Sequence, residues 1–129
     1  MFLEAYREGH ILAGASIGDF YYYGVWGERD YLEAIRWFMI GANAGVPKYY
    51  HAIGSSYHQL HNCQEAVNWY MRAANLGYSD ACFDLGYMYE NGDGVFENKR
   101  LAVQYYQQGA GLGNTYCVEA LDRLRQMDF

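Results

Sequence analysis

The twelve-residue stretch AVNWYMRAANLG, residues 66–77, has a related copy on each side. AIRWFMIGANAG occupies residues 34–45, and AVQYYQQGAGLG occupies residues 102–113. The shared pattern is A-[IV]-x-[WY]-[FY]-x-x-[AG]-A-x-[AL]-G. On a helix, the first alanine, the aromatic residue three later and the small pair seven and eight later lie on one face. The closing glycine suits the left-handed residue that ends a helix, so the pattern predicts three copies of one helix with a stop.

A second pattern predicts another helix after each stop. It is a glycine that follows an aliphatic residue and precedes a tyrosine by three positions, in ASIGDFY, HAIGSSY and FDLGYMY. A glycine inside a helix costs about 1 kcal/mol relative to alanine, so three in register indicate close helix contacts. We call these segments A helices and the first set B helices. The glycines are Gly18, Gly54 and Gly86, nine residues after Gly9, Gly45 and Gly77.

The linkers from A to B helices differ in length. YYGVWGERD and ENGDGVFEN are long and glycine-rich, whereas HQLHN is short and has no glycine. Asp30, Asn62 and Asn98 are predicted N-caps of the B helices. Glu33 and Glu65 follow the first two by three residues, which resembles a capping box.

Composition limits the classes of protein and partner. The chain has 129 residues, of which 52% are apolar, so it can bury a core and favours a single folded domain. Its formal net charge of −6 disfavours nucleic acid and anionic lipid and suits a basic partner. We see no signal peptide and no apolar run long enough for a membrane helix.

The cysteines are few, odd in number and widely spaced, which favours a reduced, cytoplasmic compartment. They are Cys63, Cys82 and Cys117.

One cluster invites a metal hypothesis. His58-x-x-His61 precedes Cys63, and His51 lies nearby in sequence. Imidazole and thiolate bind zinc. However, His61 and Cys63 fall at the short turn, and nothing in the sequence fixes a fourth ligand. The sequence therefore predicts neither a metal nor a cofactor.

The two patterns together resemble the Sel-one-like repeat (SLR), a relative of the tetratricopeptide repeat, over residues 9–125. The clearest copy reads A81-x3-L85-G86-x2-Y89, G92-x-G94-V95 and A102-V103-x-Y105-Y106-x3-A110-x2-G113. The second repeat departs from it by lacking the G-x-G-V linker. The expected organisation is one solenoid domain over 1–129, with an N-terminal partial helix at 1–9, repeats at 10–45, 46–77 and 78–113, and a C-terminal capping helix at 114–129.

The resemblance implies an all-α fold, a right-handed α/α superhelix of helical hairpins whose A helices line a concave face. One hairpin cannot bury its own apolar face, whereas stacked copies can. Trp37, Trp69, Tyr57 and Tyr89 are therefore expected to be scaffold.

The candidate binding residues are A-helix positions that tetratricopeptide geometry turns toward the concave face. Rings are expected to anchor a partner, and acids to set the encounter rate. The acids in question are Asp19, Glu90 and Glu119, and the rings are Tyr22, Tyr23, Phe83 and Tyr87. The full set is Asp19, Tyr22, Tyr23, His51, Ser55, His58, Phe83, Tyr87, Glu90, Glu119 and Arg123.

No catalytic motif accompanies these residues. The GDG at 92–94 lacks the Gly-Lys-Ser/Thr ending of a P-loop, and no acid closes it as a calcium loop. Some SLR proteins are linked to β-lactam binding or hydrolysis, but no serine here is followed three residues later by lysine, since the only lysines are Lys48 and Lys99.

Three functional classes follow. The first is a non-catalytic protein-binding module, most concretely an immunity protein that neutralises a basic toxin or effector. The second is a signalling or secretion adaptor, and the third is an enzyme, which the missing motifs disfavour. The sequence leaves the oligomeric state open.

Overall fold

The computed structural model describes residues 2–24 and 27–127, and the side chains from Gly9 onward. Parts of three predicted segments lie outside these residues: Met1 of the partial helix, Val25 and Trp26 of the first linker, and the last two residues of the capping helix. Within the described residues, the chain forms helices and no strand. None of these helices is both long and apolar enough to cross a membrane. The helices are α1 (Phe2–Tyr23), α2 (Tyr31–Asn43), α3 (Pro47–Gln59), α4 (Cys63–Asn75), α5 (Ser79–Asn91), α6 (Lys99–Gly111) and α7 (Thr115–Gln126).

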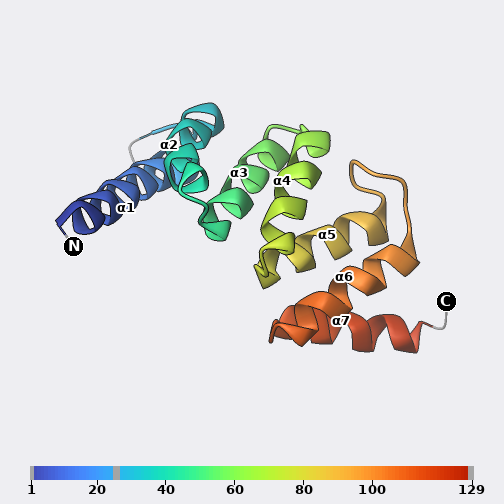
Figure 1. Cartoon of the computed structure of the whole chain (residues 1–129). Helices are drawn as coiled ribbons and strands as arrows, with labels where there is room; N and C mark the ends of the chain where they lie inside the picture. Colours follow the sequence, from blue (N-terminus) through green and yellow to red (C-terminus); the bar gives the residue numbers. More distant parts are fainter. Residues whose placement is uncertain (1, 25–26, 128–129) are drawn as a thin grey trace.

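The helices follow one another in space in the order of the sequence (Figure 1). A helices α1, α3 and α5 pair with B helices α2, α4 and α6, and α7 packs on α6. This arrangement confirms the predicted superhelix of helical hairpins.

Each of the three glycines in the A-helix pattern lies under a ring of its partner helix. A Cβ added to Gly86 would lie 2.5 Å from Cε1 of Tyr106. Phe38 occupies the same position over Gly18, and Tyr70 over Gly54. The close helix contacts predicted from these glycines are therefore present. The covering ring stands four residues after the repeat alanine, not at the third position that the sequence analysis emphasised.

The ends of the B helices match the prediction. Gly45, Gly77 and Gly113 have positive φ angles of 82°, 87° and 93°. After α2, the Val46 amide donates to the Gly41 carbonyl and the Gly45 amide to the Ala42 carbonyl. These two bonds form a Schellman motif, which satisfies carbonyls that the helix leaves unpaired.

The starts of the B helices match the predicted capping in part. Asp30, Asn62 and Asn98 each accept a hydrogen bond from the amide three residues later, as predicted N-caps do. The N-cap amides are satisfied differently from a capping box. They donate to carbonyls of the preceding A helix, with Asp30 N to Tyr21 O at 2.8 Å, Asn62 N to Tyr57 O at 2.9 Å and Asn98 N to Tyr89 O at 2.8 Å.

The first helix corrects one boundary. A partial helix was predicted to end at Gly9, but α1 continues from Phe2 to Tyr23. Gly9 is not among the glycines with positive φ. Glycine permits a left-handed stop without requiring one, and its cost inside a helix is only about 1 kcal/mol.

The core forms three clusters joined by tyrosines. One cluster centres on α2 and α3, one on α4 and α5, and one on α6 and α7. Tyr57 packs against the first two clusters, and Tyr89 packs against the last two. Both are scaffold residues, as predicted, and they connect successive repeats. Trp69 packs against the first cluster, beside the ring of Tyr50.

Candidate functional site

Two surface hollows lie between helices of successive repeats. The N-terminal hollow, of about 270 Å³, lies mainly between α1 and α3. The C-terminal hollow, of about 470 Å³, lies mainly between α5 and α7. The first is lined by Asp19, Tyr22, Tyr23, Phe38, Lys48, His51, Ala52, Ser55 and Tyr78. The second is lined by Phe83, Tyr87, Glu90, Asn91, Tyr106, Tyr116, Glu119, Ala120 and Arg123.

The structure divides the predicted binding residues between these hollows. Their spacing in sequence did not indicate this separation. Asp19, Tyr22, Tyr23, His51 and Ser55 line the N-terminal hollow, whereas Phe83, Tyr87, Glu90, Glu119 and Arg123 line the C-terminal hollow. His58 lines neither of them.

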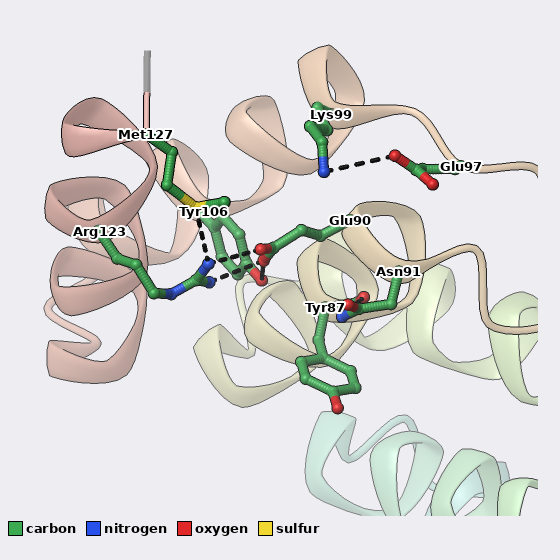
Figure 2. A network of polar contacts seen from close by, with 8 residues as sticks. All are labelled: Tyr87, Glu90, Asn91, Glu97, Lys99, Tyr106, Arg123 and Met127. Atoms are coloured by element: carbon green, nitrogen blue, oxygen red, sulfur yellow. Dashed lines mark hydrogen bonds and ion pairs between the residues drawn. The ribbon is translucent and has the colours of Figure 1, made fainter. Parts of the chain in front are cut away.

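A polar network forms the base of the C-terminal hollow. Figure 2 shows Arg123 reaching from α7 to the carboxylate of Glu90 on α5. Its Nη1 and Nη2 donate to the two carboxylate oxygens at 2.6 and 2.8 Å. The hydroxyl of Tyr106 donates to Oε1 of Glu90 at 2.8 Å. A carboxylate with three donors is firmly held, so this network joins α5, α6 and α7.

Glu90 therefore differs from its predicted role. It is only 7% exposed, so its charge is not available to steer a partner. The hydrogen bonds from Arg123 lower the pKa of Glu90, with a smaller contribution from Tyr106, and keep the carboxylate ionised. Burial, assisted by Glu90, raises the pKa of Tyr106 and keeps its hydroxyl protonated as a donor. Glu90 therefore has a structural role, because it connects α5 to α6 and α7 at the base of the hollow.

Exposed rings surround this network. Phe83 is half-buried and contacts Tyr106 and Tyr116, with centroid distances of 5.9 and 5.7 Å. Tyr116 is 64% exposed and Tyr87 is 52% exposed. In Figure 2, the Tyr87 ring points away from the Glu90–Arg123 pair. The hollow thus has a rigid charged base and accessible aromatic sides.

The N-terminal hollow has a similar division between fixed and accessible rings. Tyr22 lies 4.9 Å from Tyr23, 5.4 Å from Tyr31 and 6.5 Å from Phe38 between ring centroids. Burial raises the pKa of Tyr22. This ring, predicted to anchor a partner, is partly buried against the core. Tyr23 is 64% exposed and is the accessible ring of this hollow.

His51 is held in place from the next repeat. Its Nε2 lies 2.5 Å from Oδ2 of Asp84 on α5. Its ring also lies 5.3 Å from Tyr70 and 5.2 Å from Tyr78 between centroids. The imidazole therefore links α3 to α5 and offers a preorganised polar group beside the hollow.

Sequence reasoning missed two exposed residues that line the hollows. Lys48 and Tyr116 stand three residues after Gly45 and Gly113, respectively. In the last three A-type helices, the predicted face begins six residues after the closing glycine, at His51, Phe83 and Glu119. Because positions three residues apart share a helix face, extending that face by one turn would have included both residues.

A third hollow, of about 630 Å³, lies beside the α5–α6 linker and is the largest of the three. Phe96, which is 95% exposed, contributes to it. Close by, His58 contacts Asp93 with Nε2 2.9 Å from Oδ2, and Cys63 Sγ lies 3.6 Å from Oδ1 of the same carboxylate. The sequence gives no indication of this contact, because Asp93 follows His58 and Cys63 by more than one helix.

These features define a helical-repeat solenoid with preorganised surface hollows and no strand among the described residues. The family model for the Sel1 repeat matches residues 12–46, 41–78 and 79–114. The chain therefore belongs to the Sel1 repeat family. Repeats of this family generally bind protein partners, and the fold is generally a non-enzymatic interaction module.

The relatives include bacterial and human proteins. The chain is 27% identical to a Sel1 repeat protein from Oxalobacter formigenes, with a TM-score of 0.69 and coverage of 83% of this chain and 45% of that one. It is 27% identical to a protective antigen present in uropathogenic Escherichia coli strains, with a TM-score of 0.73 and coverage of 88% and 25%. It is 29% identical over 103 residues to human protein sel-1 homolog 2. That match covers 80% of this chain but only 10% of the human protein.

Proposed function

We propose that this chain is a non-catalytic module that binds a protein partner through the A-helix hollows. The observation that carries the proposal is that exposed rings border both hollows. Tyr87 and Tyr116 border the C-terminal hollow, and Tyr23 borders the N-terminal hollow. Aromatic side chains bury large areas at small entropy cost and are common hot spots of protein interfaces.

The scaffold beneath the rings supports this role. Glu90, Arg123 and Tyr106 fix α5 relative to α6 and α7, so the rings of the C-terminal hollow stand on helices already in place. A preorganised surface loses less conformational entropy when a partner binds. Affinity then depends on how well the partner fills the hollow and covers its rings.

The most concrete form of this function is an immunity-type protein of a bacterium, acting in the cytoplasm on a basic toxin or effector. The net charge of −6 favours encounter with a basic protein. An adaptor is the second candidate, because two separate hollows can hold two clients or two segments of one client.

The test begins with affinity purification from the source cell and identification of the protein that co-elutes at low and high salt. Binding of that protein is then measured for Tyr87→Ala and Tyr23→Ala. We expect Tyr87→Ala to cost about 2 kcal/mol, or roughly thirtyfold in Kd, with unchanged helix content. A comparable loss for Tyr23→Ala would indicate that one partner spans both hollows.

The matched control is Phe96→Ala, which removes an exposed ring from the linker hollow instead. We expect it to leave Kd unchanged. If Phe96→Ala abolishes binding while Tyr87→Ala and Tyr23→Ala do not weaken it, the partner binds at the linker and the proposal is wrong.

A further inference from the structure

Three side chains with different donor atoms meet between the second and third repeats. His58 lies in the last turn of α3, Cys63 is the first residue of α4, and Asp93 lies in the α5–α6 linker. Their imidazole nitrogen, sulfur and carboxylate oxygen all lie within 4.8 Å of one another. The backbone thus brings together three potential ligands that the sequence separates.

The backbone around Asp93 holds it in this position. Gly92 and Gly94 on either side have positive φ angles of 67° and 75°. The Asp93 amide donates to the Met88 carbonyl at 2.9 Å. A Cβ added to Gly94 would collide with the Cβ of Cys63, so the linker packs directly on that residue. The backbone of Asp93 is therefore held by glycine geometry and close packing, and its carboxylate contacts His58 and Cys63.

The donor set selects a class of metal ion. Zinc accepts nitrogen, sulfur and carboxylate ligands at about 2.0–2.3 Å in tetrahedral geometry, which separates neighbouring donors by roughly 3.3–3.8 Å. The distances from the Asp93 carboxylate to His58 Nε2 and Cys63 Sγ, 2.9 and 3.6 Å, are close to that separation, and no pair of the three donors exceeds 4.8 Å. Calcium and magnesium prefer oxygen ligands alone.

We propose that His58, Cys63 and Asp93 form a binding site for zinc or a similar divalent transition metal, with a fourth position open to water. The side chains of His58 and Asp93 are 38% and 36% exposed, so an ion can reach them from solvent. Binding forms a metal–sulfur bond and releases the thiol proton of Cys63 to solvent. The bound ion would fasten α3 and α4 to the linker that carries Phe96.

The test uses the full chain without a polyhistidine tag, stripped with a chelator and kept reduced. Zinc chloride is titrated while bound metal and the midpoint of thermal unfolding, Tm, are measured. We expect one zinc per chain and a Tm that rises with zinc concentration. Cobalt chloride should give visible absorption of a tetrahedral site with a sulfur-to-cobalt charge-transfer band.

The ligand variants are His58→Ala, Cys63→Ala and Asp93→Asn, and each should lose stoichiometric zinc and the Tm increase. The control is His61→Asn, which removes the neighbouring imidazole while asparagine tolerates its positive φ of 62°. It should bind zinc like the parent. Absence of stoichiometric zinc in the parent, retention in Asp93→Asn, or loss in His61→Asn would each overturn the assignment.

Discussion

Glu90 shows how one buried side chain can determine the shape of a surface hollow. Its carboxylate accepts hydrogen bonds from Arg123 and Tyr106, which stand on two other helices. Its pKa is lowered chiefly by the Arg123 hydrogen bonds. The charged form is therefore stabilised in the folded state relative to the unfolded chain, where a glutamate titrates near pH 4.3.

This difference predicts a specific loss of stability in acid. Because the folded pKa is the lower one, the stabilisation is complete above the unfolded pKa and is lost as pH falls through the folded pKa. We expect Glu90→Gln to lower Tm at neutral pH and the difference from the parent to shrink below about pH 4.3. Thermal melts across this range provide the measurement, with exposed Glu119→Gln as the control. A difference that stays constant with pH would contradict the linkage.

At the level of helices, the fit between Gly86 and Tyr106 sets how closely α5 and α6 approach. Tyr106 is completely buried, so its ring cannot move aside into solvent. A methyl group on Gly86 would lie 2.5 Å from that ring. The same fit recurs in each hairpin, which explains why a residue unfavourable for helices stands at this position.

Alanine substitution at two glycines should therefore have opposite effects. Gly86→Ala should destabilise the protein by about 1–3 kcal/mol, because it overpacks a close contact. Gly111→Ala should stabilise it by about 0.5–1 kcal/mol, because nothing lies within 4 Å of the added Cβ and alanine is the better helix former. Urea unfolding measures both. Equal effects would show that Gly86 is not constrained by Tyr106.

The helices and their ends could be predicted because they depend on local signals. The closing glycines, the Asx N-caps and the repeat pattern each act within one turn of a helix. The site was harder to predict because it depends on contacts between repeats. Whether Glu90 is exposed depends on Arg123 of another helix, and whether His58 has a partner depends on Asp93. The repeat pattern predicted which helix face each residue lies on, but it did not predict which side chain of another repeat contacts that residue.

On the scale of the whole molecule, most of the net charge lies outside the two hollows. Glu90 and Arg123 compensate each other in the C-terminal hollow, which leaves the single charge of Glu119, and Asp19 and Lys48 carry opposite charges in the N-terminal hollow. The net charge of −6 is therefore a property of the chain as a whole. Such a field acts on encounter more than on the strength of the final contact.

The association rate with a basic partner should accordingly fall as salt is added, while the dissociation rate changes little. The Debye length shortens from about 30 Å at 0.01 M salt to about 10 Å at 0.1 M, which screens the long-range attraction. Stopped-flow association and dissociation with the co-purified partner at these concentrations measure both rates. An association rate that does not depend on salt would exclude electrostatic steering by the net charge.

The hydrogen bonds that close each hairpin have a consequence for protein engineering. The N-cap amide reaches the A-helix tyrosine carbonyl across the long linkers 24–30 and 92–98 and across the short turn 60–62 alike. The same closing hydrogen bond therefore forms whether the linker is long or short. Because closure entropy grows slowly with loop length, we expect a foreign peptide inserted between Leu60 and His61 to be tolerated as long as Asn62 keeps its N-cap contacts.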